Sequence, residues 1–88
     1  MLRITTLFNV GHNVHLKVEG QVVGDWVPIL DATCGTWLAQ NKHVLLDFSD
    51  VTFIDRSGVE ALRRLLGDRV RIIGASWFAQ SLLGLGVG

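Results

Sequence analysis

The chain has 88 residues, enough for one domain with a modest core, and we expect a single domain over residues 1–88. Its 8 basic and 8 acidic residues balance, which excludes the basic footprint of a nucleic-acid binder, and its single cysteine excludes an internal disulfide. No apolar run approaches the ~18 residues of a membrane span and no apolar leader opens the chain, so we expect a cytoplasmic domain without direct membrane insertion.

Two segments rich in β-branched residues open the chain, Leu2 to Phe8 and Val14 to Val18. Between them, residues 9–13 include Gly and Asn, which supply turn chemistry. In the second segment apolar and polar residues alternate, which is typical of a strand with one buried face. The two segments therefore predict an N-terminal β-hairpin.

After the hairpin, apolar residues recur at helical spacing, which predicts a helix that runs to about Gln40. Asp25 is the expected N-cap, and Pro28 is tolerated because it lies in the first turn. The apolar residues that should face the core are Val27, Leu30, Cys34 and Leu38.

Strand and helix patterns alternate in the second half of the chain. His43 to Phe48 is a nearly unbroken apolar run, as expected of a strand covered on both faces. A helix should follow from Gly58 to about Leu66, a strand from Arg69 to Ile73, and a short helix from Ser76 to Leu83. The predicted fold class is α/β, in the order ββαβαβα. It should form a mixed four-stranded sheet with three helices mainly on one face, because so short a chain can hardly cover two.

The tetrapeptide Asp-Arg-Ser-Gly at residues 55–58 joins the third predicted strand to the second helix. Ser57 and Glu60 match the Ser-x-x-Glu capping box, in which each side chain bonds a free backbone N–H at the helix start. Gly58 would allow close packing there. Helix initiation thus accounts for Ser57, Gly58 and Glu60.

Arg56 is not explained by helix initiation, because a cation beside a helix N-terminus opposes the macrodipole. We expect its side chain to point outward, since Phe53 and Ile54 before it belong to the packed run. A protruding arginine at this place suits an acidic or carbonyl-rich partner.

Trp77 is a second candidate contact. On the last predicted helix the buried stripe should comprise Phe78 and Leu82, with Ala79 and Leu83 beside them, which places Trp77 on the opposite face. An exposed tryptophan among small polar residues is typical of an interface anchor. Alternatively, Trp77 folds back over the sheet edge, and the sequence leaves both possibilities open.

Other candidate chemistry is weak. His12 and His15 lie in a turn and on a strand with only His43 as a further ligand, and Asp47 and Asp50 suit solvation of a strand end. No set of nucleophile, base and orienting group can be assembled. We therefore expect no catalytic residue, no metal site and no cofactor.

The stretch VLLDFSDVTFIDRSGVEALRRLL, followed by RVRIIGAS, resembles the signature of the STAS domain, the fold of sulfate transporters and anti-sigma factor antagonists. The family pattern has an apolar strand ending Leu-Asp-Leu-Ser, then Val-x-Phe-Ile-Asp-Ser-Ser-Gly. It matches Leu46 to Ser49, Val51 to Asp55, and Ser57 with Gly58. The resemblance covers nearly the whole chain.

The resemblance implies a non-catalytic module that binds proteins. Stand-alone bacterial members bind an anti-sigma factor that is a kinase-like ATPase, and phosphorylation of the Ser or Thr directly after the Asp ends that binding. Here that position is Arg56, and Ser57 is the remaining hydroxyl that a kinase could modify. The implied partner-binding residues are Asp55, Arg56, Ser57 and Gly58, to which the residue pattern adds Trp77.

Two other functions remain open. One is an accessory STAS subunit of an ABC-type lipid transporter, whose partner would be the transporter ATPase, and the other is a small-molecule or nucleotide sensor. The oligomeric state that we expect is a monomer or a weak dimer.

Overall fold

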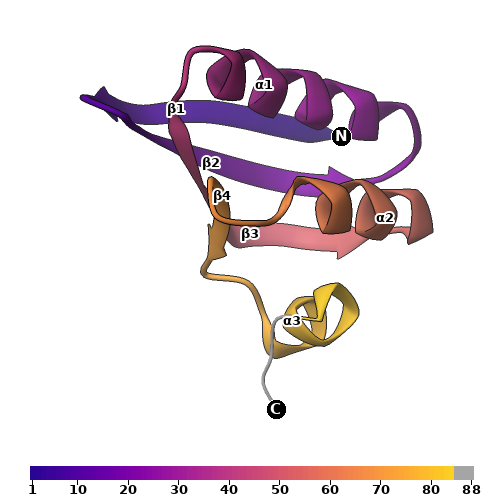
Figure 1. Cartoon of the computed structure of the whole chain (residues 1–88). Coiled ribbons are helices and arrows are strands. Elements are labelled where there is room, and N and C mark those ends of the chain that lie inside the picture. Colours follow the sequence, from indigo (N-terminus) through magenta and orange to yellow (C-terminus); the bar gives the residue numbers. More distant parts are fainter. Residues whose placement is uncertain (85–88) are drawn as a thin grey trace.

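A computed structural model describes residues 1–84 as a four-stranded sheet, in the order β1-β2-β3-β4, with three helices (Figure 1). β1 pairs antiparallel with β2, and the pairs β2–β3 and β3–β4 are parallel. The predicted hairpin and the order ββαβαβα are confirmed. The elements are β1 (Leu2–Val10), β2 (Asn13–Val22), a 3-10 turn (Gly24–Trp26), α1 (Val27–Ala39), β3 (His43–Ile54), α2 (Arg56–Leu65), β4 (Val70–Ile73) and α3 (Trp77–Leu83).

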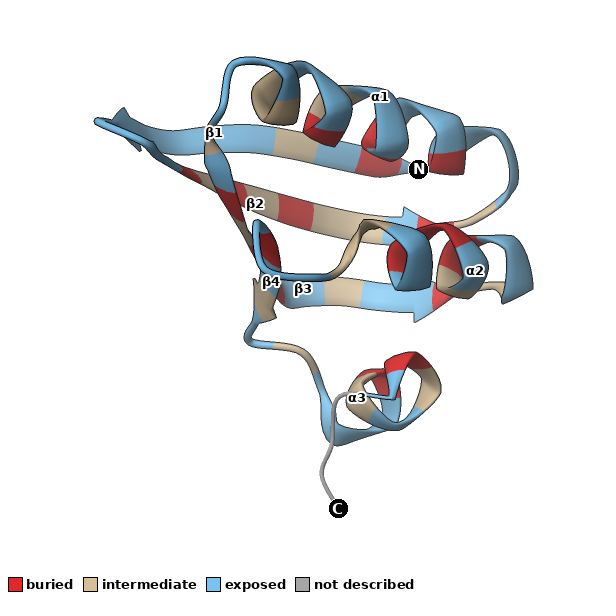
Figure 2. Cartoon of the chain, in the orientation of Figure 1, coloured by how far each residue is buried: buried red, intermediate tan, exposed pale blue. Residues whose placement is uncertain are grey.

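The core lies between the sheet and helices α1 and α2 (Figure 2). Because side chains alternate across a strand, the register that places Val14 beside Val44 and Leu16 beside Leu46 lines up apolar residues on one face. Leu30 of α1 and Leu62 of α2 close over them. Each fully buried side chain of this size contributes about 1.5–3 kcal/mol.

β3 is covered on one face only, so the prediction of a strand covered on both faces is wrong. Val44, Leu46 and Phe48 are buried, whereas Leu45 and Asp47 between them are partly exposed. The reason is that α1 and α2 pack side by side against the same face of the sheet. β3 is also longer than expected, because its pairing with β2 continues through two register shifts as far as Ile54.

α1 begins without a side-chain cap, so the prediction that Asp25 is the N-cap is wrong. Asp25 lies inside the 3-10 turn, and Trp26 takes the N-cap position with no side-chain hydrogen bond. The turn itself satisfies the Val27 N–H, which donates to the carbonyl of Gly24. Pro28 lies in the first helical turn, as predicted.

β4 pairs only with Val44–Asp47 because the chain turns away at Gly74. Gly74 has a φ of +72°, and a Cβ there would lie 2.9 Å from Asp47 Oδ1 and 3.1 Å from the backbone nitrogen of Ser49. The Ser49 hydroxyl and then its N–H donate to Asp47, and these bonds hold the pKa of that carboxyl below its ordinary value. β3 therefore extends past the end of β4, and α3 follows the turn.

Candidate functional site

Asp55 caps α2. Its Oδ1 accepts the Gly58 N–H at 2.8 Å and the Ser57 hydroxyl at 2.9 Å. The predicted capping box of Ser57 and Glu60 is wrong, because the helix already begins at Arg56 and Ser57 lies inside it. Asp and Ser are both favoured N-cap residues, so residue type alone does not distinguish Asp55 from Ser57 as the cap.

The same carboxylate joins two segments that are distant in the sequence. Asp55 Oδ2 accepts the Gly24 N–H at 2.9 Å, and the Asp55 N–H donates to the Val22 carbonyl at 3.2 Å. The N–H groups of Gly58 and then Gly24 hold the pKa of Asp55 below its ordinary value. Asp55 therefore fixes the start of α2 to the end of β2, and it stays ionised at neutral pH.

Gly58 lets α2 approach the strand ends closely, as the sequence indicated. Its backbone is buried, and a Cβ added to it would collide with the carbonyl oxygen of Val22 and lie 2.9 Å from Ile54 Cγ2. Any side chain at this position would push the beginning of α2 away from the sheet.

Arg56 points into solvent, as expected, with its side chain 94% exposed. Its ionic contact is with Glu60 one turn later, where Nε lies 3.8 Å from Oε2. Such an exposed pair contributes at most ~1 kcal/mol, so the guanidinium can exchange Glu60 for another acid. Ser57 beside it is exposed as well. The hydrogen bonds of Asp55 thus fix the backbone at the start of α2, while the Arg56 side chain remains free to change its ionic partner.

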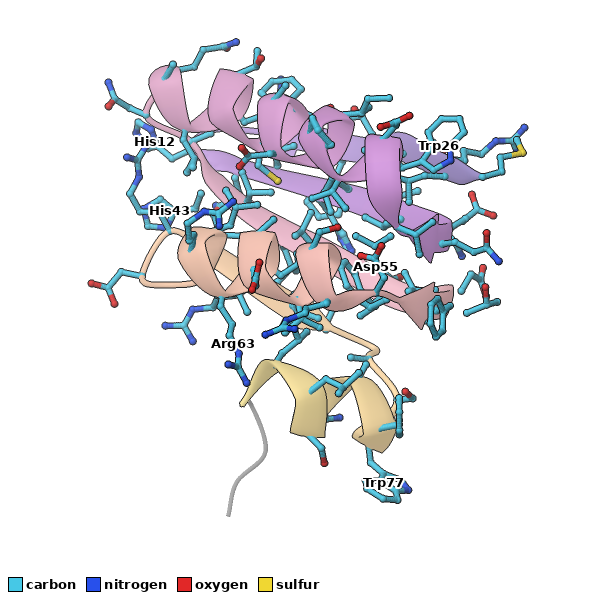
Figure 3. The ribbon with its side chains drawn as sticks, turned by 90° about the vertical axis from the view of Figure 1, so that its right-hand side faces the viewer. His12, Trp26, His43, Asp55, Arg63 and Trp77 are labelled. Carbon is cyan, nitrogen blue, oxygen red and sulfur yellow. The ribbon has the colours of Figure 1, made fainter. Side chains whose placement is uncertain are left out.

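Trp77 is 78% exposed and points away from the sheet in Figure 3, so it does not fold back over the sheet edge. Phe78 is 61% exposed, which contradicts its predicted place in the buried stripe. Ala79 and Leu83 are buried instead. Ser76 caps α3, because its hydroxyl oxygen accepts the Ala79 N–H at 3.1 Å.

Phe53 is a surface residue that the sequence analysis missed, since it was assigned to the packed run. It is 55% exposed, while its neighbour Ile54 is buried. Strict alternation along the strand would have separated the two. A shallow hollow lined by Phe53, Ile54, Ser76 and Phe78 lies between β3 and α3. This hollow connects the strand end before Asp55 with the helix that carries Trp77.

The histidines lie away from the candidate site. His12 and His43 are neighbours at the end of the molecule away from Asp55 (Figure 3), where the His43 N–H donates to the His12 carbonyl at 2.6 Å. No three His, Cys, Asp or Glu residues within 1–84 could hold a metal ion. Cys34 is buried, and desolvation with a smaller effect of Asp31 raises its pKa to about 11. No helix among the described residues is long and apolar enough to cross a membrane.

Comparison with known proteins identifies the fold. The family model of the STAS domain matches residues 5–75. An anti-sigma factor antagonist from Mycobacterium paratuberculosis superposes with a TM-score of 0.73 at 20% identity, over 97% of this chain and 80% of that one. The anti-sigma factor antagonist SpoIIAA in its unphosphorylated form gives 0.74 at 18% identity, over 96% and 84%.

An antisigma-factor antagonist STAS domain from Rhodobacter sphaeroides gives a TM-score of 0.52 at 24% identity, over 83% of this chain and 86% of that one. No curated protein matches the chain in sequence. At these identities the three structures establish a shared fold, which the family match supports independently.

Proposed function

The chain belongs to the STAS domain family, and from this premise we propose that it is a non-catalytic protein-binding module of the anti-sigma factor antagonist type, acting in partner-switching regulation of transcription. The observation that carries the proposal is the start of α2 at residues 55–58. Its backbone is held by Asp55 and Gly58, while the side chains of Arg56 and Ser57 project into solvent.

In this proposal Arg56 is the main residue that the partner contacts. A guanidinium can form two parallel hydrogen bonds to one carboxylate, so an acidic side chain or a row of carbonyls on the partner would suit it. The partner that the family suggests is an anti-sigma factor with a kinase-like ATPase domain. Trp77 and the hollow beside Phe53 would extend the contact with apolar area.

Arg56 occupies the position where the family carries the phosphorylated Ser or Thr, so this chain has no hydroxyl there for a kinase to modify. We therefore propose that binding is constitutive or set by partner abundance. Ser57 is the alternative site of modification. Its side chain is exposed, and its hydroxyl donates to Asp55 Oδ1. A phosphate on Ser57 would therefore lie beside the capping carboxylate and repel it. A phosphorylated Ser57 would therefore loosen the start of α2 as well as change the charge of the surface.

The test uses the purified chain as bait in lysate of its source, with mass spectrometry of what is retained. Wild type is compared with Arg56→Glu and with Arg64→Glu, an equal charge change at another exposed position of α2. We expect wild type and Arg64→Glu to retain a kinase-like anti-sigma ATPase and Arg56→Glu to lose it. The thermal midpoint of Arg56→Glu should stay close to that of wild type, since Arg56 makes only an exposed ionic contact. Arg64→Glu should lower it slightly, because Arg64 lies in the last turn of α2, where a cation favours the macrodipole.

Retention by Arg56→Glu equal to that of wild type would show that the start of α2 is not the contact surface. Retention of a transport ATPase with its permease would instead favour the accessory subunit of a lipid transporter. Intact-mass analysis of the bait after incubation with the partner and ATP would show whether Ser57 gains a phosphate.

A further inference from the structure

β1 forms an open edge of the sheet. Among the described residues it pairs only with β2, while α1 packs against β2, β3 and α2 and so lies toward the middle of the sheet. The opposite edge differs, because β4 has four residues and carries Arg71. β1 has nine residues.

The composition of β1 gives this edge little protection. Sheet edges in monomeric proteins are usually blunted by lysines, prolines, inward-pointing charges or β-bulges. β1 holds a single charged residue, Arg3, and no proline, and its apolar residues Leu7, Phe8 and Val10 are exposed. A β-bulge between Thr6 and Phe8 interrupts its far half, which leaves the first half as the regular stretch.

One hydrogen bond shows which N–H and C=O groups of β1 face away from β2. The Met1 carbonyl accepts the Gln21 N–H at 2.8 Å, so the carbonyl of residue 1 faces β2. Alternate residues of a strand direct their N–H and C=O groups to opposite sides. Within the regular stretch, the groups of Ile4 and Thr6 therefore face away from β2 and are available to another strand.

We infer that β1 pairs antiparallel with β1 of a second copy of this chain, about a two-fold axis at Thr5, to give a continuous eight-stranded sheet. This register sets Ile4 of each copy opposite Thr6 of the other, which joins their outward-facing backbone groups. It also sets Arg3 opposite Leu7, so the two arginines stay apart. Only a register centred on Arg3 itself would place them face to face.

The inference does not depend on the proposed partner. β1 and β4 are opposite edges of the sheet, so pairing through β1 leaves the β3 end, α2 and α3 of both copies free. A dimer would then present two copies of the α2 start at residues 55–58, and a partner with two copies of its own site would bind with avidity.

Sedimentation equilibrium tests the pairing. Strand pairing alone gives a small interface, so we expect self-association over roughly 1 to 500 µM, with a dissociation constant on the order of 10 µM. Thr5→Lys places two lysines opposite each other, near the partner's Arg3, and should weaken association at least ~10-fold. Thr5 is exposed, and circular dichroism would verify that the variant is folded.

Two further samples make the result specific. An equimolar mixture of Thr5→Lys and Thr5→Glu should regain association, because the opposed charges now attract. Thr36→Lys, the same change on the exposed side of α1, should associate as wild type does. The inference would be overturned by a wild type that stays monomeric across this range, by association of Thr5→Lys equal to wild type, or by a mixture that recovers nothing.

Discussion

Gly58→Ala should destabilise the protein although alanine is the better helix former. The added Cβ would collide with the Val22 carbonyl oxygen and lie 2.9 Å from Ile54 Cγ2. That oxygen belongs to the backbone and accepts the Asp55 N–H at 3.2 Å, so it cannot rotate away as a side chain could. The start of α2 must move instead.

The magnitude follows from two opposing effects. Overpacking of this kind costs about 1–3 kcal/mol, and a backbone obstacle favours the upper part of that range. Replacing glycine by alanine in a helix returns at most ~1 kcal/mol. The net loss is about 2 kcal/mol in the free energy of unfolding, equivalent to roughly 8–16 °C in the thermal midpoint of a domain this small.

Gly35→Ala is the matched control. Gly35 also lies within a helix, α1, but a Cβ there meets nothing within 4 Å. This variant should gain about 0.5–1 kcal/mol, which raises the midpoint. Urea denaturation and calorimetry of both variants would measure the difference. A Gly58→Ala variant as stable as wild type, or equal to Gly35→Ala, would refute the close approach of α2 to β2.

Three other outcomes are expected. The lowered pKa of Asp55 means that its stabilising effect is present above the ordinary carboxyl pKa of ~3.9 and is lost as pH falls through the folded value. Asp55→Asn should therefore lower the thermal midpoint near neutral pH and flatten its fall as pH drops below about 5, whereas an unchanged profile would contradict this role. Cys34, buried with a pKa of about 11, should not react with Ellman's reagent near pH 8 until urea unfolds the chain; rapid native reaction would show that the core is open. Leu62→Ala should cost about 2–5 kcal/mol in urea denaturation, while the exposed Trp77→Ala should change stability by less than ~0.5 kcal/mol, and similar losses in both would place Trp77 in the core.

Local composition, turn residues and periodicity predicted the elements and their order. The alternation in Val14 to Val18 and the helical spacing of Val27, Leu30 and Cys34 identified faces that are buried in the structure. The motif around Asp55 identified the family. The outward direction of Arg56, expected from its place after Phe53 and Ile54, is confirmed, although Phe53 is itself exposed. These properties depend on neighbours within about one helical turn or one strand, which local sequence specifies.

Tertiary structure decided what depends on distant neighbours. Asp55 takes the cap, and with it the bond to Gly24, because the end of β2 lies beside it, 31 residues back in the chain. Gly58 is needed because the Val22 carbonyl occupies the space of a side chain. Phe53 is exposed because α3 approaches it only across a hollow, whereas Ile54 beside it is buried in the core. A pattern can show that a strand or helix has two faces, but which face is buried depends on where the other elements pack.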